Sequence, residues 1–263
     1  MVQELRHFED YLHDRPKPTG LDVLCGLKHF SIITYAVPAE RFEGIFPDRF
    51  KLDTVIIDGI EKGLISVVPF IDVDFTSAVF PFPTFTMGQT NYRIYIIDIE
   101  TGERCVWFLG TTLDSWTLAI PRYLWNLPWH SADMTFDCHF DNETGRYTKY
   151  SVTADSEWAT AEVSLEQKVE DVFAFTGFPD TESALVYLTH PLAGFYHRRD
   201  GKLGTYRVWH KRLNVRPASL ISANFKLLST LGIVTPSEQN QPYSVLIEPL
   251  NKFTIYLPPQ IID

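Results

Sequence analysis

The chain contains little cysteine, no long apolar run and no cluster of basic residues. Its three cysteines lie far apart and form no C-x-x-C pair, which argues against a disulfide framework and a thiolate zinc site; they are Cys25, Cys105 and Cys138. We expect them to be small buried hydrophobic residues. No run approaches the roughly 18 to 20 apolar residues that cross a bilayer, and the polar N-terminus has no signal-peptide core.

The charge balance is acidic. The chain has 23 Lys and Arg against 33 Asp and Glu, a net charge of −10, and no basic residues interleaved with aromatic ones. We therefore expect neither a nucleic-acid partner nor an anionic membrane partner, and we expect a cytoplasmic protein. The chain also lacks the glycine-rich nucleotide-binding motifs and the G-x-S-x-G motif of serine hydrolases, so we expect no cofactor.

The remaining composition is that of a globular protein. The chain has 263 residues, of which 45% are hydrophobic and 14% aromatic, enough for one large domain that buries roughly three quarters of its unfolded surface. Residues 1–20 are polar and aperiodic, and we interpret them as an N-terminal arm, with a frayed terminus as the alternative. Residues 21–263 are predicted to form a single domain.

Most of this domain is predicted to be β-structure. Runs of β-branched and aromatic residues between turn signals predict strands at residues 29–37, 52–57, 64–70, 89–100, 104–112, 134–140, 146–152, 158–166, 195–198, 205–213, 243–248 and 253–257. Helical spacing predicts short helices at residues 38–46, 118–127, 181–188 and 218–231. The pattern predicts a mainly β fold, a curved antiparallel sheet or barrel around a central cavity with a few short helices.

Residues 118–130 interrupt this β pattern. Side-chain oxygens just before the segment can cap a helix, and Pro121 suits a first helical turn. Pro128 then ends the element. The residues that follow, Trp129 and His130, are therefore predicted to lie at a fixed place beside the sheet.

The same segment resembles the active-site helix of acetoacetate decarboxylase-like proteins. In that family the helix carries an arginine, a proline and then two lysines, the first of which forms a Schiff base with a keto acid. Arg122 and Pro128 fit this pattern, but Trp129 and His130 replace the lysines. The resemblance therefore implies that acetoacetate decarboxylase activity is absent. If the chain is an enzyme, we expect a lyase-like reaction without a lysine imine.

Six short stretches, spread over about nine-tenths of the chain, form a second recognisable pattern; they are residues 35–41, 67–70, 91–95, 106–109, 127–130 and 253–258. In this order they resemble the YqjF-like family, domain of unknown function 2071, a branch of the same superfamily. This resemblance implies the curved β architecture of the superfamily. It does not define a reaction.

Three polar residues alternate along the predicted strand 89–100 and share one face: Gln89, Asn91 and Arg93. A lone arginine among apolar neighbours needs an anionic partner. A bound carboxylate would satisfy it through two parallel hydrogen bonds. The alternative is an internal ion pair with Glu248 or Asp114.

Five further residues are candidates for the site. His130 is the candidate catalytic acid or base, and Trp129 is a candidate apolar wall, although both also suit simple packing. Arg122 is a candidate ligand contact by its match to the decarboxylase helix. Lys28 corresponds to an arginine near the substrate in the decarboxylases. His210 matches a histidine of the YqjF-like pattern and is a candidate ligand contact, with a core hydrogen bond as the alternative.

Acidic and imidazole side chains alternate at Asp137, His139 and Asp141, but such a run is more typical of a solvated face, and we expect no metal site. Our first hypothesis is a protein that binds a small, partly apolar organic acid in its cavity and transforms it without a Schiff base. The alternatives are a non-catalytic carrier or sensor that uses the same cavity, and a structural protein. Assembly of identical chains is compatible with the sequence.

Overall fold

The computed structural model describes residues 7–11, 14–170 and 172–262. Strands dominate it: β1 Val23–Pro38, β2 Phe50–Leu52, β3 Val55–Ile57, β4 Ile60–Ser77, β5 Phe85–Asp98, β6 Arg104–Asp114, β7 Trp129–Ser131, β8 Asp133–Asp141, β9 Arg146–Asp155, β10 Ala161–Gln167, β11 Ala193–His197, β12 Leu203–His210, β13 Arg216–Phe225 and β14 Ser244–Ile262. The helical elements are short: α1 Phe8–Tyr11, η1 Ala39–Phe42, η2 Trp116–Leu118, η3 Ile120–Leu124, α2 Thr181–Thr189, α3 Lys226–Thr230 and η4 Glu238–Asn240. The predicted mainly β fold is confirmed.

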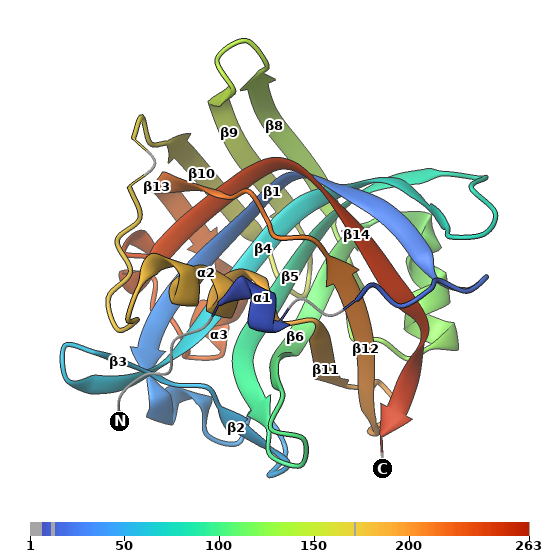
Figure 1. The fold of residues 1–263 in the computed structure, drawn as a ribbon, viewed down its shortest axis with the longest axis horizontal. Coiled ribbons are helices and arrows are strands. Elements are labelled where there is room, and N and C mark those ends of the chain that lie inside the picture. The colour runs from blue at the N-terminus through green and yellow to red at the C-terminus, as the bar shows by residue number, and fades with distance from the viewer. Residues whose placement is uncertain (1–6, 12–13, 171, 263) are drawn as a thin grey trace.

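Seven strands pair in a closed ring. The order is β1, β4, β5, β6, β11, β12 and β14, and β14 returns to pair with β1 (Figure 1). The long strand β14 makes this closure, because its first part pairs with β1 and its last part with β12. The sheet is curved and mostly antiparallel, as predicted, but β6 pairs in parallel with both β7 and β11, so the sheet is mixed.

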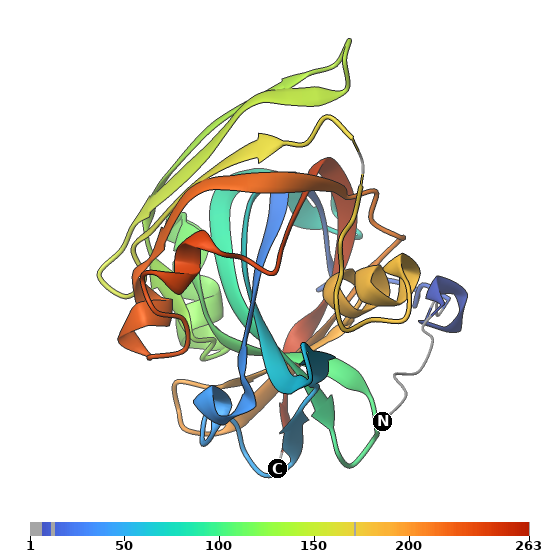
Figure 2. The same cartoon turned by 90° about the vertical axis from the view of Figure 1, so that its left-hand side faces the viewer.

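A second layer covers one outer side of the ring. Strands β8, β9, β10 and β13 pair with one another and lie against it (Figure 2). The core between the layers includes Ile33 and Ile94 from the ring and Tyr150 and Leu165 from the covering strands, all at most 3% exposed. Ring strands are therefore apolar on both faces where they are covered. This explains why β1 and β4 each contain a continuous run of buried residues.

The predicted helix at residues 218–231 is wrong. The first part of this segment is β13, which pairs with β10 over most of its length. Only Lys226–Thr230 is helical. Tertiary pairing with β10 outweighs the local helical pattern here, as it commonly does when a neighbouring strand offers a complete ladder of hydrogen bonds.

Other boundaries also differ from the prediction. The strands expected at residues 243–248 and 253–257 are one continuous strand, β14. The helix expected at residues 118–127 is shorter, a 3₁₀ turn at Trp116–Leu118 followed by a π-type turn at Ile120–Leu124. Asn126 then adopts a positive φ of 55°. This ends the helical turns two residues before Pro128.

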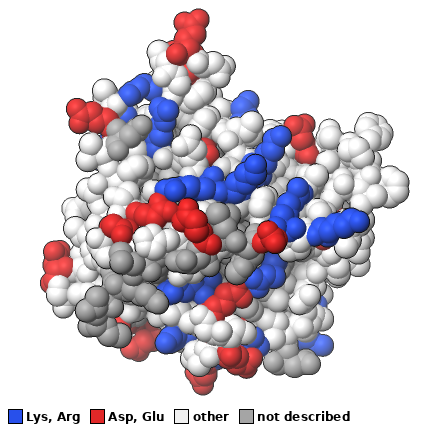
Figure 3. Space-filling model, viewed as in Figure 1, with Lys and Arg blue, Asp and Glu red and all other residues white. Residues whose placement is uncertain are grey.

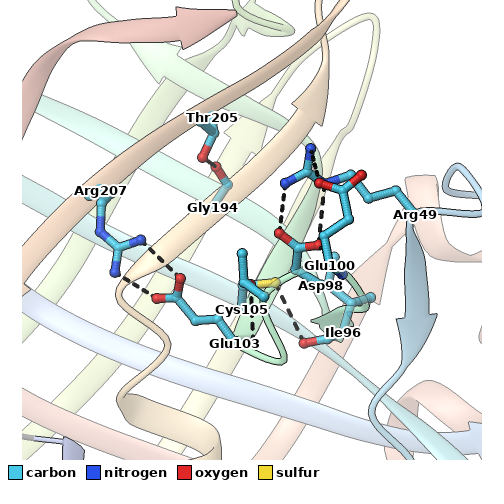
Figure 4. Close-up of polar contacts among 10 residues, drawn as sticks. Arg49, Ile96, Asp98, Glu100, Glu103, Cys105, Gly194, Thr205 and Arg207 are labelled. Carbon is cyan, nitrogen blue, oxygen red and sulfur yellow. Dashed lines mark hydrogen bonds and ion pairs between the residues drawn. The ribbon is translucent and has the colours of Figure 1, made fainter. Parts of the chain in front are cut away.

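Charged side chains hold one end of the ring together (Figure 4). Arg49, which precedes β2, pairs with Asp98 at 2.8 Å and with Glu100 at 3.1 Å. Glu103, at the other side of the β5–β6 turn, accepts two hydrogen bonds from Arg207 of β12. The turn is thereby joined both to the residue before β2 and to β12, which lies beyond β11 in the ring.

The described part of the N-terminal arm contacts α2. Phe8 is 2% exposed, its ring lies 4.3 Å from that of His190, and its backbone N–H donates to Glu182. Residues 1–6 and 12–13 of the predicted arm lie outside the described residues.

Lys and Arg are interspersed with Asp and Glu on the face shown in Figure 3. In the part of the chain that the structure describes, no helix is long and apolar enough to cross a membrane.

Candidate functional site

The interior of the ring contains a cavity of about 310 Å³. Its walls come from β1, β4, β5, β6, β12 and β14, together with residues 116–129. Most of the wall is apolar, including Phe70, Phe108, Trp125, Trp129 and Phe253. An apolar cavity with a few polar groups is the usual form of a small-molecule site. The segment that interrupts the β pattern thus forms part of the wall.

Strand β5 contributes a row of polar side chains to this wall. Gln89, Asn91 and Arg93 all line the cavity, on the face that alternation predicts. The Gln89 amide donates to the Asn91 side-chain oxygen at 2.9 Å, and the Thr111 hydroxyl donates to the same oxygen at 2.7 Å. These bonds fix the orientation of the Asn91 side chain. The role of the row as ligand contacts stays a prediction.

Arg93 has no carboxylate partner among the described residues. Its guanidinium donates to the backbone oxygen of Leu188 at 2.9 Å and to the Tyr95 hydroxyl at 3.5 Å, and its Nε is buried without a partner. The predicted alternative, an ion pair with Glu248 or Asp114, is wrong. Glu248 accepts hydrogen bonds from residues 214 and 251, and Asp114 is exposed.

A second ionisable group of the wall, Asp72 of β4, was not among the predicted site residues. It is 2% exposed, lines the cavity, and has one carboxyl oxygen, Oδ2, without a partner in the described structure. Burial raises its pKa to about 7, and hydrogen bonding from the neighbouring Cys25 thiol opposes this shift. The sequence does hold a signal for it. Asp72 follows Val68 and Phe70 at intervals of two residues, so strand alternation predicts that it faces the cavity as they do.

Strand β12 adds two groups on another side of the cavity. The Tyr206 ring stacks on Phe108, with centroids 5.5 Å apart, and burial raises the pKa of its hydroxyl. His210 is 1% exposed and lines the cavity. Burial lowers its pKa to about 3, so the ring is neutral, and Nδ1 lies 2.7 Å from the Lys211 backbone oxygen. His210 therefore lines the cavity and makes a hydrogen bond within the protein, and its role as a ligand contact stays a prediction.

Trp129 and His130 lie on opposite faces of β7. Trp129 lines the cavity, whereas His130 does not: its ring stacks on Trp158 with centroids 4.1 Å apart. The prediction that His130 lines the cavity is wrong, because successive residues of a strand alternate between faces. Burial, followed by the charges of Arg122 and Arg199, lowers the pKa of His130 to about 4.

Arg122 and Lys28 also lie off the cavity wall. Arg122 donates to the backbone oxygen of Trp129 at 2.6 Å, so it holds the strand that presents the Trp129 ring. Lys28 is exposed on β1, next in the chain to Leu27, which faces the cavity. Neither side chain is placed to contact a ligand in the cavity directly, which corrects the prediction for both.

The comparison with protein families identifies the chain's family. The model DUF2071, described as an uncharacterized conserved protein, matches residues 26–249. The chain belongs to the DUF2071 family. A comparison with curated protein sequences finds no match.

Solved structures share the fold of this DUF2071 protein. An acetoacetate decarboxylase-like enzyme from Sphingomonas wittichii is 12% identical, with a TM-score of 0.60 over 93% of this chain and 94% of that one. The acetoacetate decarboxylase of Legionella pneumophila is 14% identical, with a TM-score of 0.57 over 100% and 98%. The enduracididine biosynthesis enzyme MppR, complexed with a condensation product of pyruvate and imidazole 4-carboxaldehyde, is 9% identical, with a TM-score of 0.57 over 94% and 90%. At these identities, the likeness shows an acetoacetate decarboxylase-like fold.

The cavity of this DUF2071 protein differs from an imine-forming site in one respect. Among the described residues, no lysine lines the cavity.

The described residues also contain no group of three or more side chains that could hold a metal ion. Asp137 and His139 of β8 are exposed side chains, 3.7 Å apart, and Asp137 also pairs with Lys149, as a solvated face would predict.

Proposed function

We infer that this DUF2071 protein binds a small, partly apolar organic acid in its cavity, with Arg93 as the anchor for the carboxylate. The observation that carries this proposal is the state of Arg93, a cationic side chain on the wall of an apolar cavity with no carboxylate partner in the described structure and an unpaired buried Nε. Arg93 is partly buried, and a charge that is partly removed from water in this way is stabilised by a counter-charge. A ligand carboxylate supplies that charge and accepts two hydrogen bonds from a guanidinium.

The apolar wall defines the rest of the ligand. Trp129, Trp125 and Phe70 present flat or bulky hydrocarbon surfaces to the cavity. A ligand that occupies this space gains from burying its own apolar area, roughly 25 cal/mol per Å². A purely polar acid of the same charge gains nothing from these walls. The ligand class is therefore a carboxylate with a hydrocarbon part.

The experiment compares acids with their uncharged analogues. Calorimetric titration near neutral pH would use straight-chain carboxylates and the corresponding primary amides, on the natural protein and on Arg93→Met. We expect the natural protein to bind acids better than amides, and Arg93→Met to weaken acid binding by about 30-fold, the loss of a charge-assisted hydrogen-bonded pair. Equal binding of acid and amide by the natural protein would refute the proposal.

Arg41→Met is the matched control. Arg41 pairs with Glu238 on the surface, away from the cavity wall, so its loss removes one positive charge without touching the site. Acid binding by this variant should equal that of the natural protein. If Arg93→Met unfolds, Arg93→Lys keeps the charge while losing the bidentate geometry, and the proposal then requires weakened but measurable acid binding.

One observation favours a second candidate, transformation of the bound acid without an imine. Asp72 lies on the cavity wall with a pKa of about 7, so it can give or take a proton near neutral pH. A carrier needs no such group. Incubation of each acid that binds, followed by mass spectrometry of the mixture, distinguishes the two: a new product that Asp72→Asn fails to form supports transformation, and unchanged acid supports a carrier or sensor.

A further inference from the structure

Asp72 is a polar group that the proposed carboxylate contact does not use. It is buried on the cavity wall, and its Oδ2 has no hydrogen-bond partner among the described residues. A buried carboxyl oxygen without a partner costs roughly 1 to 3 kcal/mol. Native structures keep few such groups, and one that faces a cavity is satisfied when a ligand supplies the missing hydrogen bond.

The strand register places Asp72 far from Arg93. On the β4–β5 ladder, Ser66 lies opposite Arg93, and Asp72 lies opposite Met87. Six residues on either strand separate the two positions, about 20 Å of extended backbone. Even with side chains that lean toward each other, a compact acid of a few atoms does not reach both groups. A ligand that contacts both must be elongated.

The wall between these two ends suits a hydrocarbon chain. Phe70 and Val68 lie between them on β4, and Phe108 and Trp129 add apolar surface from other strands. The polar side chains of β5 that line the cavity along this stretch are Gln89 and Asn91, and their amides already bond to each other. The middle of the cavity thus favours burial of apolar area, and the two ends favour hydrogen bonds.

Few ionisable groups accompany Asp72. From β1, the Cys25 thiol adjoins its carboxyl, and from β12, the Tyr206 hydroxyl interacts with it electrostatically. Tyr206 interacts in the same way with Arg93, so it lies between the two ends. No cation is paired with Asp72 among the described residues. The group is therefore available to a neutral polar partner.

We propose that Asp72 is a second ligand anchor, which binds the terminal hydroxyl of an elongated hydroxy acid whose carboxylate lies on Arg93. This proposal rests on the proposed function. A hydroxyl suits Asp72 in both of its protonation states, because it donates to an ionised carboxylate and accepts from a protonated one. The raised pKa of Asp72 makes both states populated near neutral pH. The ligand class is thus a medium-chain acid with a hydroxyl at the end remote from the carboxylate.

The test measures what the hydroxyl adds. Calorimetric titration would compare terminal hydroxy acids, from butanoic to dodecanoic, with the unsubstituted acids of equal length. At the chain length that reaches both anchors, we expect the hydroxyl to strengthen binding by about tenfold in the natural protein. In Asp72→Leu, which keeps a similar shape without the hydrogen-bonding oxygens, the advantage should vanish while unsubstituted acids still bind. Asp72→Asn, which retains hydrogen bonding, should keep most of the advantage of the hydroxyl. This variant replaces the leucine variant if the latter does not fold.

The outcomes separate this inference from the proposed function. If unsubstituted acids bind in an Arg93-dependent way but the hydroxyl adds nothing at any length, Asp72 is not an anchor and the proposed function stands. The same conclusion follows if the advantage survives in Asp72→Leu. If no acid of any length binds to the natural protein, both proposals are overturned. A hydroxyl advantage that depends on chain length and on Asp72 supports the two-anchor cavity.

Discussion

The guanidinium of Arg93 donates a hydrogen bond of 2.9 Å to the backbone oxygen of Leu188, the penultimate residue of α2. The Tyr95 hydroxyl donates to the same oxygen at 3.0 Å. Carbonyl groups in the last turn of a helix have no partner within the helix and carry partial negative charge. Arg93 is thus held in position by a helix end instead of a carboxylate, and its positive charge is not neutralised.

This relationship connects the fold to the proposed binding site. α2 is not a strand of the ring, and its last residue, Thr189, lines the cavity. The loss of one hydrogen bond to this helix end would leave the strand pairing of the ring intact. The guanidinium has further donors besides the one that reaches Leu188. A ligand carboxylate can therefore bind without displacing α2, which is why we expect Arg93 to affect affinity more than stability.

The protein should not form an imine with acetoacetate. Imine formation needs a neutral lysine amine at the ketone, and acetoacetate decarboxylases obtain one by lowering the pKa of a lysine in the active site. No lysine lines this cavity among the described residues, and Lys28 is exposed on the outside of β1. Incubation with acetoacetate and borohydride, followed by intact mass measurement, should show no adduct. An adduct on any lysine, with release of carbon dioxide, would contradict this account.

His130→Phe should reduce the loss of stability in acid. The pKa of His130 is lowered from 6.5 to about 4 in the folded protein, so its contribution to stability is present above about 6.5 and is lost as the pH falls toward 4. Phenylalanine keeps the stacking on Trp158 but does not titrate. His29 and His210, whose pKa values are also lowered, should leave part of the acid loss in place. Denaturant titrations across this pH range give the slope of the free energy of unfolding against pH. Equal slopes for the natural protein and His130→Phe would rule the explanation out.

Asp72→Asn should change stability in the opposite sense. The folded pKa of Asp72 is raised from 3.8 to about 7, so its favourable contribution is present below about 4 and is lost as the pH rises through 7. Asparagine does not ionise and avoids this loss. We compare the free energy of unfolding of the variant with that of the natural protein. We expect this difference to shift in favour of the variant by up to about 4 kcal/mol between acidic and alkaline solution. Chemical denaturation on both sides of the window measures it, and a pH-independent difference would count against a raised pKa.

Gly110→Ala should destabilise the fold by about 1 to 3 kcal/mol, the cost of overpacking. A Cβ at Gly110 would lie 2.5 Å from the Trp158 ring and 2.9 Å from the backbone oxygen of Pro128. The backbone oxygen cannot move aside as a flexible side chain can. Gly20→Ala is the control, since nothing lies within 4 Å of its added Cβ. The measurement is the thermal unfolding midpoint of each variant, which should be lower for Gly110→Ala than for Gly20→Ala. Similar midpoints would show that the segment before Trp129 tolerates displacement.

Period-two alternation predicted most of the strands and the shared face of Gln89, Asn91 and Arg93 correctly. It failed for residues 218–225, which were predicted as part of a helix but belong to strand β13. There the decisive factor is the neighbouring strand β10, which is remote in sequence. Pairing partners of this kind are not visible in a local pattern.

The site shows the same limit. The sequence identified Trp129 as a wall residue but assigned its neighbour His130 to the same cavity, because a helical exit was assumed where the chain forms β7. Asp72 was overlooked, although it lies two residues after Phe70, so that alternation places both on the cavity face. Its unpaired oxygen and its burial, which raises its pKa, depend on the elements that pack around it, and only the folded chain brings these together.

The most direct test of the binding site is a crystal structure of the protein soaked with a terminally brominated straight-chain carboxylic acid. Anomalous scattering locates the bromine without relying on the shape of the ligand density. We predict bromine within the cavity and the carboxylate within hydrogen-bonding distance of the Arg93 guanidinium, at about 2.7 to 2.9 Å. Bromine found only on the surface, or a ligand in the cavity with its carboxylate turned away from Arg93, would contradict the proposed function.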